Sequence, residues 1–251
     1  MTSQPAHQDV NGRTGASLSP NTARDDEFAQ RAAATYLRLT GQEPADADIA
    51  DDGTFDRHVL ASILAVASAE KGIVAERVGL AADDLATLIE GKFPRACNAI
   101  AGWCRTGKAA DEAETEMVCE LLMAHRSTEG ETGRWLAAMV ARRAMEPNHL
   151  WEDLGLRDRS ELTRLLTRHF APIAVRNTNN MRWKRFFYRS VCENEGLLMC
   201  STPVCSQCGD FEICFSDESG ESRMAYQRRA LALKVASLSE PGEIVAPQAV
   251  S

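Results

Sequence analysis

Four cysteines gather in one short segment near the C-terminal end of the sequence, in the pattern C-x4-C-x2-C-x5-C. They are half of the eight cysteines in the chain: Cys200, Cys205, Cys208 and Cys214. Thiolates this close in sequence can converge on one metal centre, because Pro203 and Gly209 can bend the backbone between them. The pattern therefore predicts a metal or metal–sulfur site in this segment.

The spacing also bears on which metal the segment would hold. A structural zinc site typically uses two C-x2-C pairs that are separated by a longer spacer. Here only Cys205 and Cys208 form such a pair. The flanking spacings of four and five residues are closer to the single-segment runs that ligate iron–sulfur clusters. The spacing favours an iron–sulfur centre, and a structural zinc loop in an interaction protein is the alternative.

Two side chains upstream of the array are possible additional ligands. Cys192 precedes the first cysteine of the array by eight residues, and His169 lies farther back. Thiolate and imidazole both bind transition metals. The alternative for each is an ordinary packed side chain, since small thiols are among the most buried residues.

The segment that leads into the cysteines predicts an amphipathic helix. Within residues 181–192, one helical face carries large apolar side chains: Trp183, Phe186, Phe187 and Val191. Cations on the same segment are candidates for contact with a partner or an anion: Arg182, Lys184, Arg185 and Arg189. Residues 157–189 hold nine basic residues against two acidic ones. The alternative is that these cations pair with carboxylates elsewhere in the protein.

The composition is that of a soluble globular protein, with 251 residues, 44% of them hydrophobic and 25% charged. A net charge of −8 argues against a protein that binds nucleic acid, because duplex affinity depends on neutralising phosphates. The longest apolar stretch, residues 60–69, is about half as long as a membrane-spanning helix. The N-terminus lacks the features of a secretory signal, so we expect a cytoplasmic protein with reduced thiols and no membrane association.

The elements that must position these residues are predicted to be helices. Apolar residues recur with helical spacing over 26–39, 55–69, 73–78, 83–89, 112–125, 133–145 and 160–170. Breakers such as Pro94 and Pro172 fall between these segments. The predicted fold class is therefore all-α, an irregular multi-helix domain followed by a cysteine-rich cluster-binding loop.

The chain divides further by composition. Both ends are rich in small and polar residues and cannot repay the entropy of ordering. The expected organisation is a disordered tail (1–25), a helical domain (26–180), the basic aromatic helix with the cluster loop (181–215), a C-terminal helical segment (216–235) and a second disordered tail (236–251).

Residues 148–215 resemble the NifQ family of nitrogen-fixation proteins. The resemblance rests on the run Met-Arg-Trp-Lys-Arg-Phe-Phe-Tyr-Arg (181–189), on the cysteine array, and on the segments 150–156 and 169–177. It implies a carrier, not an enzyme, that donates molybdenum for biosynthesis of the nitrogenase iron–molybdenum cofactor. It also implies a molybdenum–iron–sulfur cluster, held by the four cysteines of the array and delivered to the scaffold NifEN and the Fe protein NifH.

A transcription regulator that carries a cluster or a zinc ion is a second functional class. Residues 73–89 have the cadence of a helix-turn-helix around Gly79. Asp83, Asp84 and Glu90 place negative charge where DNA phosphates require cations, so a packed helical pair explains this segment better. The sequence contains no Gly-rich phosphate loop, H-E-x-x-H or G-x-S-x-G motif.

Overall fold

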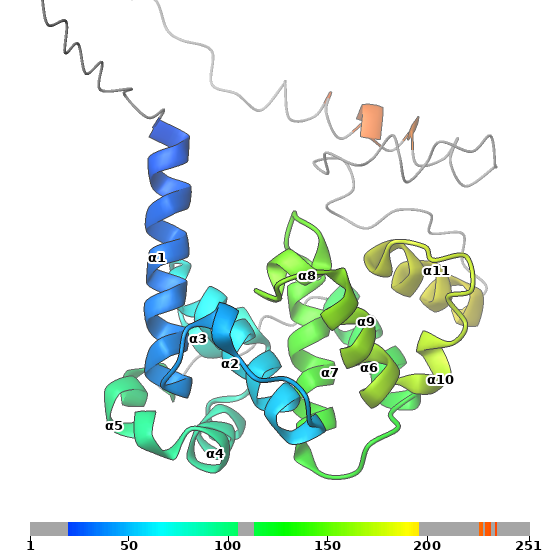
Figure 1. The fold of residues 1–251 in the computed structure, drawn as a ribbon. Helices are drawn as coiled ribbons and strands as arrows, with labels where there is room; N and C mark the ends of the chain where they lie inside the picture. The colour runs from blue at the N-terminus through cyan, green and yellow to red at the C-terminus, as the bar shows by residue number, and fades with distance from the viewer. Residues whose placement is uncertain (1–19, 105–112, 196–225, 228, 232–233, 235–251) are drawn as a thin grey trace, which may run out of the picture.

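The computed structural model describes residues 20–104 and 113–195, together with part of the segment 226–234 (Figure 1). Every regular element within these ranges is helical, which confirms the all-α prediction. The longer helices are α1 (Pro20–Thr40), α2 (Asp52–Ala69), α4 (Ala82–Lys92), α6 (Ala113–Ala124), α7 (Glu131–Arg143), α9 (Arg159–His169) and α11 (Trp183–Glu195). The short elements are α3 (Val74–Val78), α5 (Cys97–Ile100), α8 (Leu150–Asp153), α10 (Ala171–Ala174) and the 3-10 turns η1 (Pro44–Asp46), η2 (Pro94–Ala96) and η3 (Ala101–Cys104).

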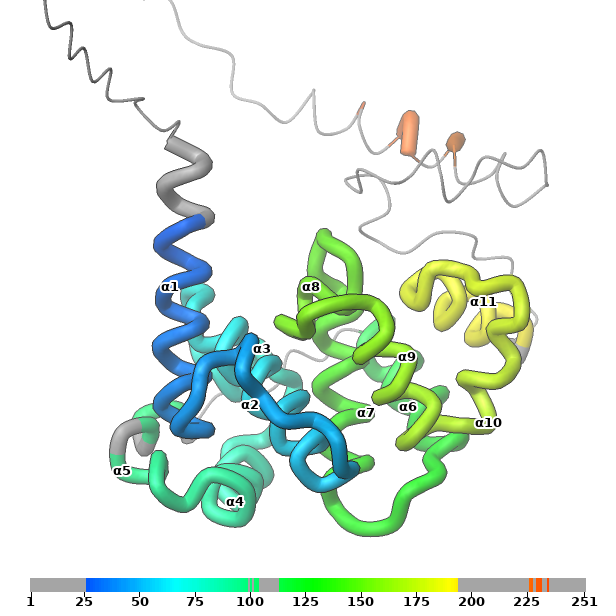
Figure 2. The backbone as a smooth tube through the Cα atoms, in the orientation of Figure 1, coloured from blue at the N-terminus to red at the C-terminus, as the bar shows by residue number. Residues whose placement is uncertain are grey.

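The body is organised around α2, which packs against α1, α3 and α7. Helix α7 packs in turn against α6, and α6 against α11, so α1 and α11 stand at opposite sides of the body (Figures 1 and 2). Leu60, Ile63 and Leu64 on α2 are fully buried, as are Val59 and Ala61 beside them. A helix that is apolar on nearly all sides has to lie in the interior, and α2 is that helix here.

Aspartate side chains cap the two helices that carry most of the buried polar contacts. At the start of α2, Asp51 accepts hydrogen bonds from the backbone N–H groups of Gly53 and Thr54, at 2.8 and 3.0 Å. At the start of α9, Asp158 accepts from the N–H of Ser160 at 2.7 Å. These bonds satisfy amides that the first helical turn leaves unpaired, and they lower the pKa of both carboxyls.

Helix boundaries differ from the sequence-based expectation at a few points. Helix α1 begins at Pro20, inside the segment 1–25 that was expected to be a disordered tail. Pro94 and Pro172 do follow the ends of α4 and α9, but each also opens a new turn, in η2 and α10. Proline suits a first turn because its missing N–H would have no partner there. Most of the expected segment 216–235 and the tail 236–251 lie outside the described residues.

The α3–α4 pair has the predicted helix-turn-helix cadence, and it is packed against α7. Gly79 ends α3 with a φ of 68°, and a Cβ atom there would lie 2.7 Å from Cβ of Arg142 and 3.0 Å from the carbonyl oxygen of Ala138. Asp84 at the start of α4 accepts a 2.9 Å hydrogen bond from Arg134 of α7. These contacts support the reading of the pair as a structural unit.

A second close approach involves Gly155, which follows α8. Its φ is 68°, and an added Cβ would lie 2.4 Å from Cγ2 of Val66 and 2.9 Å from the carbonyl oxygen of Ser62. Only glycine allows the segment after α8 to come this close to the backbone of α2. The glycine in the segment 150–156 is therefore required for packing.

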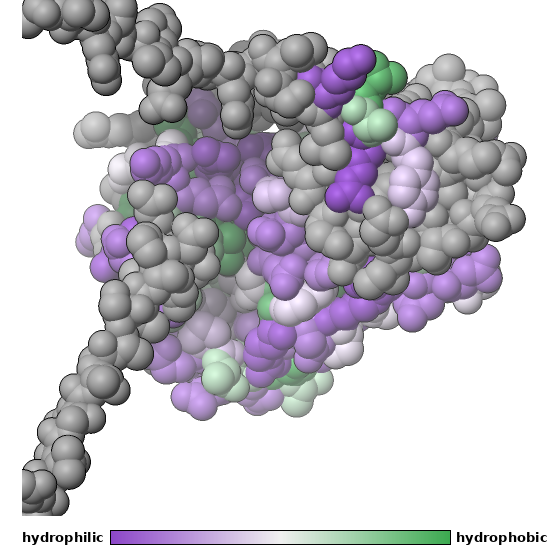
Figure 3. Space-filling view, turned by 90° about the horizontal axis from the view of Figure 1, so that it is seen from above, coloured by the Kyte–Doolittle hydropathy of each residue, from purple (hydrophilic) through white to green (hydrophobic). Residues whose placement is uncertain are grey.

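The described surface is mainly hydrophilic on the side shown in Figure 3, with hydrophobic residues scattered over it. The large apolar side chains that remain exposed are isolated ones, such as Leu37 and Val175. Within the described ranges, the helices are too short or too polar to cross a membrane.

Candidate metal centre

The predicted ligands Cys200, Cys205, Cys208 and Cys214 lie outside the described residues, as does the whole loop that carries them. Their convergence on one centre stays a prediction. Within the part of the chain that the structure describes, no three His, Cys, Asp or Glu side chains gather closely enough to hold a metal ion. The structure does describe α11, which leads into the array, and the contacts that hold α11 in place.

The aromatic face of α11 packs into the core, as predicted. Trp183, Phe186 and Phe187 are all buried, and the rings of Trp183 and Phe186 meet edge to face with centroids 5.8 Å apart. The helix is more deeply buried than its amphipathic pattern suggested, because Tyr188, Ser190 and Cys192 are buried as well. Tyr188 donates a hydrogen bond from its hydroxyl to the sulfur of Met145 at 3.1 Å. These contacts hold α11 against the core.

The start of α11 is fixed by a closed loop and by one arginine. Asn177 and Met181 exchange two hydrogen bonds, of 2.8 and 2.9 Å, between the Asn177 amide and the Met181 backbone. Nη2 of Arg159 donates to Oδ1 of Asn180 at 2.9 Å and to the Met181 carbonyl at 3.0 Å. Asn180 itself has a φ of 50°, which asparagine tolerates better than most residues. The segment 177–181 thus has well-defined partners in α9 and within itself.

The predicted contact residue Lys184 is held inside the protein. Its ammonium group lies 2.5 Å from Oδ2 of Asp153 and also donates to the backbone carbonyl of Glu146. Only 12% of the Lys184 side chain and 2% of the Asp153 side chain are exposed. Burial raises the pKa of Asp153, and the nearby Lys184 charge opposes that shift. The structure therefore does not support a partner contact at Lys184, which instead joins α11 to α8.

The other cations of the basic segment differ in exposure. Arg189 is exposed and forms a 2.9 Å ion pair with Glu193, whereas Arg182 and Arg185 are half-buried. Farther upstream, Arg168 of α9 pairs with Asp56 of α2 at 2.8 Å. Part of the positive charge is thus neutralised inside the protein, as the alternative reading held, and a contact role for Arg182, Arg185 and Arg189 stays a prediction.

Replacing Lys184 by methionine is expected to lower the free energy of unfolding by about 2 kcal/mol, because Asp153 would remain buried without its cation. Urea unfolding followed by circular dichroism measures this change. Arg189→Gln is the matched control on the same helix and is expected to change stability by no more than about 0.5 kcal/mol. Equal losses in the two variants would contradict the structural role of Lys184.

The second possible ligand, His169, is occupied by protein partners. It is 1% exposed, its Nε2 lies 2.9 Å from Oδ1 of Asp56, and its Nδ1 lies 2.7 Å from the hydroxyl of Thr128. With both ring nitrogens engaged, His169 has no nitrogen directed at a metal in this structure. Cys192 is a buried cysteine on α11, and its role as an extra ligand stays a prediction.

His169 belongs to a pair of buried histidine–carboxylate contacts between α2 and α9, which we call the α2–α9 seam: Asp56 with His169 and His58 with Glu161. Nε2 of His58 lies 3.2 Å from Oε2 of Glu161, and its Nδ1 lies 2.7 Å from the hydroxyl of Tyr36. Burial raises the pKa of Tyr36 to about 12. Sequence reasoning missed three members of this seam, although the polar Asp56 and His58 within an otherwise apolar helix were a usable signal.

The α2–α9 seam makes the free energy of unfolding depend on pH. Burial alone would raise the pKa of Asp56 and Glu161, but hydrogen bonds from His169, Arg168, His58 and Arg157 outweigh burial and hold both pKa values below their usual range. The stability that these two carboxylates contribute is therefore complete above about pH 4, the value in the unfolded chain. It is lost as the pH falls further through the lower pKa values of the folded state.

The difference in urea midpoint between the wild-type protein and Asp56→Asn is accordingly expected to be largest near neutral pH and to shrink from about pH 4 downward. A series of unfolding curves between pH 3 and pH 7 measures it. Asp48→Asn, at an exposed aspartate, serves as the control and should show a small difference at every pH. A difference for Asp56→Asn that does not vary with pH would count against the assignment.

Comparison with known proteins points to a single family. The model of the NifQ family matches residues 59–216. A NifQ homolog of Sinorhizobium fredii is 37% identical over 172 residues, which cover 67% of this chain and 75% of the relative. NifQ of Rhodobacter capsulatus is 36% identical over 161 residues, with 64% and 87% covered, and NifQ of Azotobacter vinelandii is 41% identical over 105 residues, with 42% and 54% covered. No solved structure shows a significant match.

Proposed function

Because the chain belongs to the NifQ family, we propose that it carries molybdenum for the biosynthesis of the nitrogenase iron–molybdenum cofactor. In this proposal a molybdenum–iron–sulfur cluster is the cargo, and the protein delivers it without itself catalysing a turnover. The proposed recipients are the scaffold NifEN and the Fe protein NifH.

The observation that carries the proposal is the position of the cysteine array. All four cysteines, from Cys200 to Cys214, fall inside the range 59–216 that the family model matches. Thiolates are the ligands that iron–sulfur clusters prefer, and sulfide bridges accommodate molybdenum beside iron. Residues of this type and spacing suit a sulfur-bound heterometal cluster better than a lone hard cation.

The contacts of α11 support the proposal that one side of this helix anchors it in the protein while the other side faces a partner. The apolar face of α11 and the Lys184–Asp153 pair are committed to the protein interior. Arg189 on the same helix is exposed and stands close in sequence to the array. A rigid helix with a charged outer edge is a suitable base for a segment that must meet an acidic or anionic partner surface.

Purification without oxygen, followed by metal analysis and X-ray absorption spectroscopy, tests the proposal. The expected protein is brown, contains both iron and molybdenum, and shows sulfur atoms as neighbours of both metals. A colourless protein with one zinc ion would instead indicate a structural zinc loop. Molybdenum with only oxygen and nitrogen neighbours would exclude a sulfur-bound cargo. Binding to promoter DNA with a steep dependence on salt concentration would instead favour a transcription regulator that carries a cluster or a zinc ion.

A further inference from the structure

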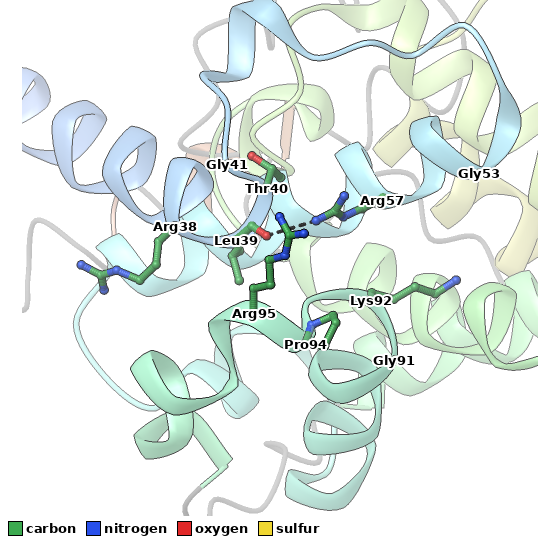
Figure 4. A pocket seen from close by; sticks show the side chains of 10 residues that line it. All are labelled: Arg38, Leu39, Thr40, Gly41, Gly53, Arg57, Gly91, Lys92, Pro94 and Arg95. Atoms are coloured by element: carbon green, nitrogen blue, oxygen red, sulfur yellow. Dashed lines mark hydrogen bonds between the residues drawn. The ribbon is translucent and has the colours of Figure 1, made fainter.

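A cavity of about 550 Å³ lies far from α11, where the C-terminal ends of α1 and α4 approach α2 and η2 (Figure 4). Its ten described lining residues are Arg38, Leu39, Thr40, Gly41, Gly53, Arg57, Gly91, Lys92, Pro94 and Arg95. Four of the ten are cations, and none is acidic. This concentration of positive charge occurs in a chain whose net charge is −8.

The cations around this cavity differ from several other arginines in the described part of the chain. Arg134, Arg143 and Arg168 each form close ion pairs with carboxylates. In the described part of the chain, by contrast, no carboxylate pairs with any of the four cavity cations. Among the described residues, Arg57 is the one cavity cation with a hydrogen bond or ring contact: it donates to the Leu39 carbonyl at 3.4 Å and lies over the ring of Phe93, with 5.7 Å to the centroid.

Helix ends account for only part of this charge. Arg38 and Lys92 stand in the last turns of α1 and α4, where the partial negative charge of a helix C-terminus favours a cation. Each helix end supplies about half an elementary negative charge, so two ends together offset about one of the four cations. A positive excess of about three charges remains among the lining residues.

Two arginines at the centre of the cavity place part of this positive charge where a single anion could bind. Figure 4 shows the side chains of Arg57 and Arg95 pointing toward one another from α2 and η2, while Arg38 and Lys92 diverge at either side. Two guanidinium groups that face each other without an intervening carboxylate repel one another. An anion placed between them would relieve the repulsion and accept paired hydrogen bonds from both planar forks.

We propose that this cavity binds a tetrahedral oxyanion, the chemical class that includes molybdate, phosphate and sulfate. Arg57 and Arg95 hold the anion between them, and Arg38 and Lys92 add long-range attraction. The site goes beyond the proposed function, and its described lining contains none of the four cysteines of the array. Arg38 and Arg57 precede residue 59, where the family match begins. If molybdate is the ligand, the cavity is where molybdenum first meets the protein as a free oxyanion.

Equilibrium dialysis of the full-length protein at low ionic strength tests this site. Sodium molybdate or sodium phosphate is added, and molybdenum or phosphorus is measured on both sides of the membrane. Saturable uptake of about one anion per chain that weakens with added sodium chloride supports the proposal. Tighter binding of molybdate than of phosphate identifies molybdate as the ligand. Equal uptake of the two anions identifies a general oxyanion site. No saturable uptake of either anion at millimolar concentration overturns it.

Single variants then assign the uptake to the cavity. Arg95 is exposed and forms no hydrogen bond or ion pair with the other described residues, so Arg95→Gln should leave the fold unaffected. Arg57→Gln removes the facing charge. Each is expected to weaken anion binding about tenfold, and the double variant to abolish it. Lys71→Gln, an exposed lysine outside the cavity, is the matched control and should change affinity by less than about twofold.

Wild-type affinity in both arginine variants, or an equal loss in Lys71→Gln, overturns the assignment. The iron and molybdenum content of the purified protein is measured in the same samples, so failure of the oxyanion site can be distinguished from failure of the proposed carrier function. Oxyanion uptake that is lost in Arg95→Gln while iron and molybdenum content is unchanged separates the two sites. If the purified protein contains only zinc but still takes up the oxyanion, the assignment of the cavity stands and the proposed carrier function is rejected.

Discussion

Replacing Cys205 by alanine is expected to abolish molybdenum loading while leaving the helical body folded. Cys205 belongs to the tightest part of the array, the C-x2-C pair with Cys208. An alanine leaves one metal of the cluster without its thiolate. The measurement is the molybdenum and iron content after purification without oxygen, compared at equal helical content by circular dichroism.

Cys119→Ala is the matched control for this experiment, because it makes the same chemical change at a half-buried thiol on α6. Burial and the nearby carboxylates raise the pKa of the Cys119 thiol, so it is a poor ligand at neutral pH. Loading should survive in this variant. Retained loading in Cys205→Ala would remove Cys205 from the ligand set.

The second large effect is expected at Arg143, whose replacement by leucine should lower the free energy of unfolding by about 3 to 5 kcal/mol. Arg143 is 1% exposed and donates two hydrogen bonds, of 2.9 and 2.7 Å, to the carboxylate of Glu70. Its Nε donates a third, of 2.7 Å, to the carbonyl of Asp153. Leucine would leave both acceptors without their donor, so α2, α7 and α8 would lose the group that joins them. Chemical denaturation monitored by circular dichroism gives the value.

Arg134→Leu provides the comparison on the same helix. Arg134 also donates hydrogen bonds to a carboxylate from both of its terminal nitrogens, that of Asp84, and these bonds, together with its positive charge, lower the pKa of Asp84. However, 38% of the Arg134 side chain is exposed, so water can replace the lost contact. The expected loss is no more than about 1 kcal/mol. Similar losses for the two variants would show that burial does not decide the contribution of these arginines.

Helical periodicity was sufficient to predict the fold class and most of the long helices. The segment 55–69 was predicted from its apolar spacing and is observed as α2, and residues 160–170 correspond to α9. Short elements such as α8 and α10 were missed, because one turn does not establish a period. The start of α1 at Pro20 was missed because polar composition was taken as a sign of disorder.

The candidate site was predictable in its outline but not in its partners. The spacing of Trp183, Phe186 and Phe187 fixed the inward face of α11 correctly. Nothing in the local sequence indicated that Lys184 would meet Asp153, since a cation's partner depends on how distant helices pack. The same limit applies to His169, whose neighbours come from α2 and from the loop before α7.

The α2–α9 seam also constrains how the chain can acquire its structure during synthesis. His58 and Glu161 are separated by 103 positions and Asp56 and His169 by 113, whereas α1 and α2 are neighbours along the chain. Contacts between distant positions form slowly, because a long loop must first close. Helices α1 and α2 can therefore pack together early on the ribosome, whereas Asp56 and His58 gain their partners only after α9 has emerged. Until then this side of α2 is open to solvent and to other proteins, which makes nascent-chain binding factors relevant to the yield of folded protein.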